Sequence, residues 1–317
     1  MRQAVIRFIG SLLFLLYNSV LFAAPWYTGP LLAPSGHTIP AGHTNLEVYG
    51  FFTDNEGIYN RHWKLTHAPM GSSIVGNPIF THGISDSMDV QFSAPYAYNR
   101  FHGQNSHHMS DVSATLGYQL IEQKGRRLIP DLRVTIQEII PTGKFEDLDP
   151  VNNGTDSTGI GSYQTAFNLN FQHLLPITDV HYLRTRLSLA YVYAADVSVY
   201  GYNSFGGAAN TLGNVHPGDL QSIDIAGELS LTQHLVAVME GFFAHRHRTR
   251  FSGYAGTNSA GQPAHIGQNP TDEITIAPAL EWNFNSNVGL IAGVWKTLAG
   301  RDTSEFKSYV IAINAFW

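Results

Sequence analysis

The sequence contains no cysteine and few charged residues. Cysteine is absent from all 317 residues, which excludes disulfide bonds, a thiol nucleophile and thiolate metal ligands. Charged side chains make up only 13% of the chain, about half of the roughly 25% that is usual in soluble globular proteins. The low charge indicates that much of the surface faces something other than water.

Long apolar runs are also missing after residue 23, where no segment approaches the ~20 apolar residues of a membrane-spanning helix. Mean hydropathy is −0.08, although 44% of the residues are hydrophobic and 12% are aromatic. This combination is typical of a transmembrane β-barrel, in which lipid-facing and lumen-facing side chains alternate and the average conceals both. The expected fold class is all-β, a single antiparallel transmembrane barrel.

The first 23 residues predict a cleaved secretory signal peptide. Arg2 and Arg7 precede a charge-free apolar segment, residues 8–22, which ends at Ala23. A single anchoring helix is the alternative, although the run is short and lacks a basic flank. Without this segment, 16 of the 18 basic residues remain against 24 acidic ones, so nucleic acid is not an expected partner. An exported barrel belongs in the outer membrane of a Gram-negative bacterium.

Residues 24–45 carry four prolines and three glycines and show no usable periodicity. This segment either extends into the periplasm or plugs the lumen. The transmembrane barrel is expected to occupy residues 46–317.

Alternating apolar and polar residues recur in segments close to the ~9–11 residues that a tilted transmembrane strand needs. In SIDIAGELSL, Ile223 and Ile225 share one face, and Asp224 and Glu228 share the other. Twelve strands are expected, at 46–54, 72–83, 88–95, 110–121, 130–141, 162–173, 181–193, 219–231, 235–247, 272–284, 287–298 and 306–317.

The connections between these segments alternate in length. Short ones are expected at 84–87, 122–129, 174–180, 232–234 and 285–286, and mostly long ones at 55–71, 96–109, 142–161, 194–218, 248–271 and 299–305. Outer-membrane barrels show this asymmetry, with short periplasmic turns and long external loops. An even strand number places both chain ends on the periplasmic side.

The last strand should close the barrel against the first. Tyr309, Ile311, Ile313 and Trp317 fall on one face, which we assign to lipid. The terminal aromatic with alternating apolar positions upstream resembles the signal read by the outer-membrane assembly machinery. That machinery is therefore an expected partner. A barrel in the outer membrane is also expected to contact outer-membrane lipid and lipopolysaccharide.

Both signs of charge fall on the face assigned to the lumen. Such charges either form a salt-bridged structural network or act as a selectivity element in a hydrated pore. Twelve strands lie between the roughly 8 that side chains can fill and the 16 that hold an open channel, so a narrow or gated pore is expected. The lumen candidates are Arg133, Gln137, Arg184, Arg186, Asp224, Glu228, Glu240 and Glu281.

Arginines alternate in AHRHRTR, after the ninth strand. If the alternation continues, Arg246, Arg248 and Arg250 share the lumen-facing phase of Glu240. At the pore mouth they could attract anionic solutes or, if the strand rotates, lipopolysaccharide phosphates. The alternative is a solvated extension of the strand.

The sequence supports neither a metal site nor a cofactor. Among 15 histidines, His107 with His108 and His245 with His247 are suggestively spaced, but no third ligand is identifiable. His108 and Ser110 could form a nucleophile pair of a lipolytic barrel. This pattern is common by chance, so the chain is not expected to be an enzyme.

Three stretches resemble one family of outer-membrane proteins, named for the MetA pathway of phenol degradation. They are HGISDSMDVQFSAPY at 82–96, MSDVSATLGYQL at 109–120 and PDLRVTIQEIIPTGKF at 130–145. The residues that match the family pattern are Gly83, Asp86, Asp89, Pro95, Tyr96, Asp111, Pro141, Thr142 and Gly143.

This resemblance implies an outer-membrane channel or transporter for small hydrophobic or aromatic molecules, and it supplies no catalytic residues. The alternative is a structural or surface-interaction barrel with a sealed lumen. A continuous apolar track inside the lumen would favour transport, whereas full pairing of Arg133, Arg184 and Arg186 with acidic residues would favour a plug.

Overall fold

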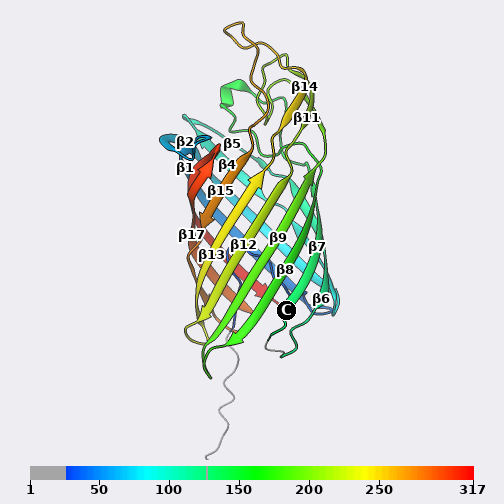
Figure 1. The fold of residues 1–317 in the computed structure, drawn as a ribbon, viewed down its shortest axis with the longest axis vertical. Helices are drawn as coiled ribbons and strands as arrows, with labels where there is room; N and C mark the ends of the chain where they lie inside the picture. Colours follow the sequence, from blue (N-terminus) through cyan, green and yellow to red (C-terminus); the bar gives the residue numbers. More distant parts are fainter. Residues whose placement is uncertain (1–25, 126–127) are drawn as a thin grey trace, which may run out of the picture.

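The computed structural model describes residues 26–125 and 128–317, except for the side chains of residues 69 and 70. The signal peptide predicted for residues 1–23 lies outside this range. The chain forms a closed antiparallel β-barrel of twelve strands, as predicted (Figure 1). Three barrel strands are each divided in two, namely β3 with β4, β5 with β6, and β15 with β16.

The bounds of the barrel segments are β1 (Thr44–Tyr59), β2 (Leu65–Ser85), β3 (Met88–Ser93), β4 (Tyr96–Phe101), β5 (Gln104–Met109), β6 (Val112–Ile121), β7 (Asp131–Ile140), β8 (Gln164–Pro176), β9 (Tyr182–Ala194), β12 (Leu220–Ser230), β13 (Leu235–Arg246), β15 (Thr271–Ile276), β16 (Ala279–Asn283), β17 (Val288–Arg301) and β18 (Thr303–Phe316). Pro95 separates β3 from β4, and Pro278 separates β15 from β16. Proline has no N–H for the ladder, so these strands break there.

The first and last strands close the barrel. β1 pairs with β2 on one side and with β18 on the other. The Trp317 N–H donates to the Thr44 carbonyl oxygen at 2.9 Å, and the Thr44 N–H donates to the Trp317 carbonyl oxygen at 2.7 Å. The predicted closure by the terminal strand is confirmed.

Side chains alternate between the two faces of the barrel wall as the sequence pattern predicts. In β12, Ile223 and Ile225 are 42% and 58% exposed, whereas Asp224 and Glu228 are buried. Within the described residues, no helix is long and apolar enough to span a membrane.

The five short connections lie at the predicted places, but three of the predicted long ones are wrong. β1 and β2 continue until only residues 60–64 separate them, residues 96–109 form the β4–β5 hairpin, and Asp302 alone joins β17 to β18. These extensions lie beyond the apolar belt. Their outward side chains do not contact lipid, so apolar residues need not occur at every second position. The backbone ladder therefore continues without the apolar alternation that would reveal it.

The other long connections, 142–161, 194–218 and 248–271, form a layer over one end of the barrel that we call the outer cap (Figure 1). It contains a three-stranded sheet of β10 (Val197–Tyr200), β11 (Leu212–His216) and β14 (Arg250–Tyr254), and a short 3₁₀ turn, η1 (Pro150–Asn152). Its buried apolar core is made by Val197, Val199, Phe205 and Val215.

Candidate channel lumen

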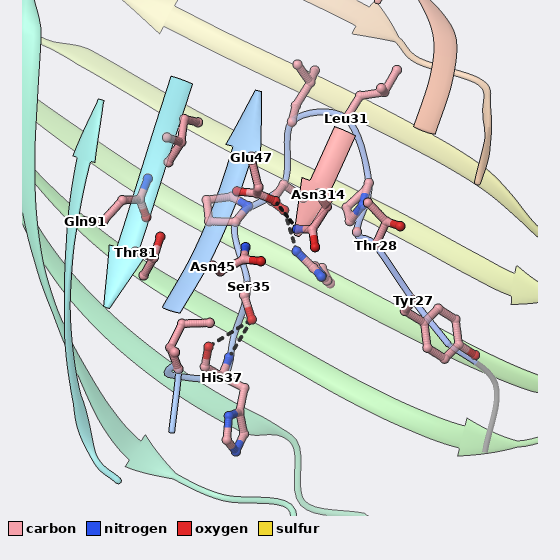
Figure 2. A pocket seen from close by; sticks show the side chains of 18 of the residues that line it. Tyr27, Thr28, Leu31, Ser35, His37, Asn45, Glu47, Thr81, Gln91 and Asn314 are labelled. Atoms are coloured by element: carbon pink, nitrogen blue, oxygen red, sulfur yellow. Dashed lines mark hydrogen bonds between the residues drawn. The ribbon is translucent and has the colours of Figure 1, made fainter. Parts of the chain in front are cut away.

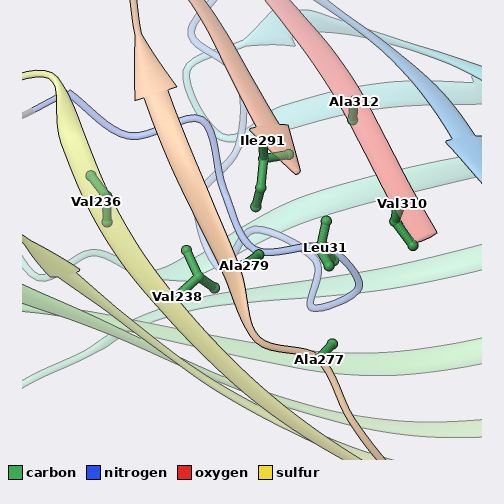
Figure 3. Close-up of a cluster of buried hydrophobic side chains, with 8 residues drawn as sticks. All are labelled: Leu31, Val236, Val238, Ala277, Ala279, Ile291, Val310 and Ala312. Atoms are coloured by element: carbon green, nitrogen blue, oxygen red, sulfur yellow. The ribbon is translucent and has the colours of Figure 1, made fainter. Parts of the chain in front are cut away.

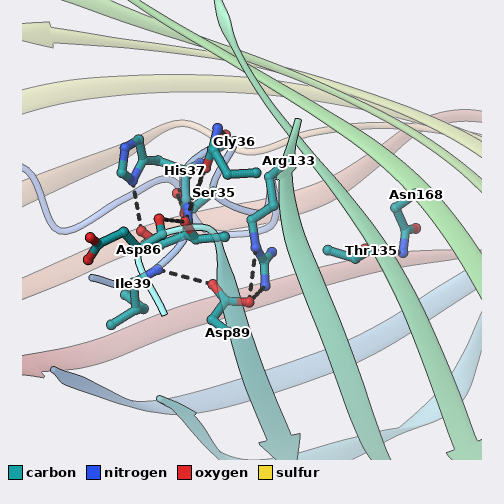
Figure 4. A network of polar contacts seen from close by, with 11 residues as sticks. Ser35, Gly36, His37, Ile39, Asp86, Asp89, Arg133, Thr135 and Asn168 are labelled. Carbon is teal, nitrogen blue, oxygen red and sulfur yellow. Dashed lines mark hydrogen bonds and ion pairs between the residues drawn. The ribbon is translucent and has the colours of Figure 1, made fainter. Parts of the chain in front are cut away.

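The lumen contains a buried ion pair between β7 and β3. The Arg133 guanidinium donates to Asp89 Oδ1 from Nη2 at 2.5 Å and from Nε at 3.2 Å (Figure 4). Both side chains are less than 5% exposed. Gly117 leaves room for the pair, because a Cβ there would lie 2.2 Å from Asp89 Oδ1. Neither charge is left without a partner.

A second charged cluster joins β9 to β12. Glu228 is fully buried and accepts two hydrogen bonds from Arg184, one of them from Nε at 2.6 Å. Arg186 Nε lies 3.5 Å from the same carboxylate. All three predicted lumen arginines thus have an acidic neighbour, which is the arrangement that favours a plug.

Most of residues 26–43 lies inside the barrel and binds carboxylates on its wall, and residues 40–43 form an exposed turn that leads into β1. The backbone N–H groups of Thr28 and Gly29 donate to Glu281 at 2.9 Å and 3.3 Å. The N–H groups of Leu32 and Ala33 donate to Glu240. Two buried carboxylates of the wall are therefore satisfied by the backbone of this segment. We call residues 26–43 the lumen segment.

Wall side chains also bind the carbonyl oxygens of the lumen segment. Arg186 Nη1 donates to the Ala33 carbonyl oxygen at 2.8 Å. Gln119 donates to the Gly36 carbonyl oxygen at 3.1 Å and accepts from the Thr38 N–H at 2.7 Å. The segment is consequently bonded along its length to several strands.

One apolar contact reinforces these hydrogen bonds. Leu31 is 3% exposed and packs against a group of small and branched side chains on the wall (Figure 3). The group consists of Val236, Val238, Ala277, Ala279, Ile291, Val310 and Ala312. Burial of a leucine of this kind contributes about 1.5–3 kcal/mol relative to its exposure.

A cavity of about 460 Å³ remains between the lumen segment and strands β1, β2, β3 and β18 (Figure 2). Its wall mixes aromatic residues, including Tyr49, Phe51 and Phe316, with polar ones such as Glu47 and Asn314. Asn314 donates to Glu47 at 3.3 Å. The lining is therefore amphipathic.

The structure places all eight lumen candidates on the inner side of the wall. Gln137 is half-buried and donates to Ser113 Oγ at 3.0 Å. The fully or nearly fully buried members are Arg133, Arg186, Asp224, Glu228, Glu240 and Glu281. Whether they determine selectivity stays a prediction.

The three mouth candidates do not share one phase. β13 ends at Arg246, whose Nη1 donates to the Gly218 carbonyl oxygen at 3.2 Å. Arg248 is exposed in the irregular segment that follows, and Arg250 begins β14 of the outer cap. The expected alternation fails because the chain leaves the barrel ladder after Arg246.

Sequence reasoning did not assign functional roles to Asp89 and Gln119. Both lie on the inward face of strands whose alternation was recognised, so their positions were available from the pattern. Their partners were not, because Asp89 meets Arg133 across the intervening strand β6 and meets the Ile39 N–H from the lumen segment, and neither contact is a local property of β3. Within the described ranges, no three His, Asp or Glu side chains form a group that could hold a metal ion.

Comparison with known proteins supports the fold. No family model and no curated protein matches the sequence. The COG4313 outer membrane channel from Pseudomonas putida F1 superposes with a TM-score of 0.65 over 90% of this chain and 100% of the other, at 10% identity. The β-domain of the Bordetella autotransporter BrkA gives 0.46 over 87% and 100%, at 9% identity. The likeness to the COG4313 channel shows that the chain has the fold of an outer-membrane barrel.

Proposed function

We propose that this protein is an outer-membrane channel for small molecules whose lumen segment closes the pore. The observation that carries the proposal is the binding of residues 26–43 inside the barrel through backbone groups. A segment held by hydrogen bonds and one buried leucine can leave without unfolding the wall. Its carboxylate partners Glu240 and Glu281 would then meet water.

The proposed solutes are small hydrophobic or aromatic molecules. Two observations support this class, namely the family resemblance of residues 82–145 and the aromatic side chains Tyr49, Phe51 and Phe316 beside the cavity. A cavity of about 460 Å³ falls within the ~300–1,000 Å³ range of small-ligand sites. Glu47 and Asn314 would orient a hydroxyl group on such a solute.

Single-channel conductance in a planar bilayer tests the proposal. The full chain is compared with a variant that lacks residues 26–39. Both proteins are measured with and without phenol, which serves as the aromatic probe. Deletion should raise the open probability or conductance several-fold, and phenol should reduce the current. If both proteins are silent and neither transports labelled phenol into liposomes, the channel proposal is wrong.

A sealed structural barrel is the second candidate, and the paired arginines favour it. Arg133, Arg184 and Arg186 all have an acidic neighbour, as expected for a plug. The liposome assay separates the two functions, because a sealed barrel admits no solute even after residues 26–39 are removed.

We also propose that the C-terminal strand is recognised by the outer-membrane assembly machinery. Its alternating apolar face and terminal Trp317 support this partner. Removing Trp317 should slow membrane insertion in reconstituted assembly without altering the lumen.

A further inference from the structure

Two neighbouring rows of outward-facing side chains cross one side of the barrel near the outer cap. The row nearer the cap, from β17 to β4, consists of Lys296, Lys307, Asp54, Ser72 and Arg100. The row two residues farther from the cap consists of Tyr309, Phe52, Ile74 and Tyr98. The second row is 36–49% exposed and belongs to the lipid-facing belt.

The cations of the first row, Lys296, Lys307 and Arg100, outnumber its one carboxylate, Asp54. Lys296 and Lys307 are directly opposite each other across the ladder, a placement that is unfavourable for like charges. Neither lysine, nor Arg100, makes an ion pair within the described residues. Asp54 lies directly opposite Lys307 in the ladder, and Asp54 and Glu56 both act electrostatically on this lysine.

A crevice of about 300 Å³ opens beside Arg100. It is lined by Asp54, Ser72, Arg100 and His102, and also by Gly71 and Gly103, which contribute no side chain. A guanidinium, a hydroxyl and an imidazole can all donate hydrogen bonds to phosphate oxygens. The crevice therefore has donors and space for a phosphate group on the side of Arg100 and His102, opposite in charge to the Asp54 carboxylate that also lines it.

We infer that these two rows bind lipid A, the membrane anchor of lipopolysaccharide. Its phosphates would contact Lys296, Lys307 and Arg100, and its acyl chains would lie against the aromatic row. The formal net charge of the chain is −6, so the protein as a whole does not attract anions. Binding of an anionic lipid must therefore depend on this group of cations, which lies at the edge of the apolar belt.

This surface differs from the one that the sequence suggested. Arg248 lies between β13 and β14, and Arg250 begins β14 of the outer cap, so neither belongs to the barrel strands that carry the lipid-facing belt. A charge cluster without an adjoining apolar row would bind phosphate without holding acyl chains. The two rows identified here supply both contacts.

Native mass spectrometry of the purified full chain tests the inference. Three lipids are compared, namely diphosphoryl lipid A, dephosphorylated lipid A and phosphatidylglycerol. Each is added to the wild type and to two variants. The first variant is Lys296→Gln/Lys307→Gln/Arg100→Gln, and the second is Lys124→Gln/Arg248→Gln/Arg250→Gln. The first variant should bind diphosphoryl lipid A about a hundredfold more weakly, since each of the three basic residues near an anionic lipid contributes about 1 kcal/mol and every ~1.4 kcal/mol is tenfold in affinity. The second variant, which removes three charges elsewhere, should bind like the wild type.

Equal loss in the two variants would overturn the inference, and so would equal binding of the three lipids by the wild type. The lipid comparison on the wild type remains decisive even if a variant folds poorly. All three substituted side chains face outward, so single-channel conductance should not change. Failure of lipid A binding is thus separable from failure of the channel proposal.

Discussion

At the scale of single residues, the lumen is organised by buried charges that each depend on a specific partner. Arg133 and Asp89 are almost fully buried, and removing one leaves the other without an opposite charge, so that Asp89 would keep only the hydrogen bond from the Ile39 N–H. Broken buried pairs cost far more than the intact pair contributes, because an isolated charge in a low dielectric is poorly solvated.

Arg133→Met should therefore lower the free energy of unfolding by about 3–5 kcal/mol. Urea unfolding of the barrel in phospholipid vesicles, followed by tryptophan fluorescence, measures this change. The double variant Arg133→Met/Asp89→Leu removes both charges and should recover most of the loss. A single variant as stable as the wild type would show that water solvates Asp89.

Outside the membrane-spanning strands, Asp156 in the outer cap is a second charge with a fixed partner. Burial acts to raise the pKa of Asp156, but the Lys144 ammonium at 2.8 Å and the Asp149 N–H at 3.1 Å outweigh it, so the pKa is lowered. A lowered carboxyl pKa stabilises the folded cap above the ordinary Asp pKa of about 3.9.

Cap stability should accordingly stay constant from pH 7 to about pH 5 and fall as the pH drops through the folded pKa of Asp156. Hydrogen exchange of residues 142–161 measures the opening. Asp156→Asn should weaken the cap at neutral pH and flatten this acid response. An acid response of unchanged size in the variant would assign it to another group.

At the scale of elements, the lumen segment fits the wall through close backbone contacts. A Cβ on Gly36 would lie 2.6 Å from both the backbone nitrogen and the Cβ of Gln172. These atoms belong to β8 and cannot move aside without distorting the ladder.

Gly36→Ala should displace the lumen segment and raise single-channel open probability several-fold, while the barrel remains folded. Gly76→Ala is the matched control, because a Cβ there meets no heavy atom within 4 Å. Equal currents from both variants would mean that the segment does not close the pore.

At the scale of the whole molecule, the bilayer is the solvent for the outer face. Ile225, in the middle of β12, is 58% exposed, which in a water-soluble protein would make it tolerant of substitution. In a membrane barrel the same position meets hydrocarbon, where a charge is costly.

Ile225→Lys should therefore destabilise the protein by about 2–4 kcal/mol in vesicles, measured by reversible urea unfolding. The control Ser222→Ala changes a lumen-facing side chain of the same strand and should have a much smaller effect. A neutral Ile225→Lys would place this face in water rather than lipid.

The amino-acid sequence alone determined the barrel class, the twelve strands and the inward phase of the eight lumen candidates. These features follow from the alternation of side chains, which is a local property of each strand. The outer extensions of β1, β2, β4 and β5 escaped prediction because the ladder there carries no apolar alternation.

Only the tertiary structure decided which charges pair, where residues 26–43 lie and which cations face lipid. Asp89 and Arg133 are 44 residues apart, and Thr28 and Glu281 are 253 residues apart. Periodicity specifies the face of a side chain, but strand pairing and the path of residues 26–43 specify its neighbours. The contacts between the wall and residues 26–43 are therefore set by strand register and curvature, which no local pattern encodes.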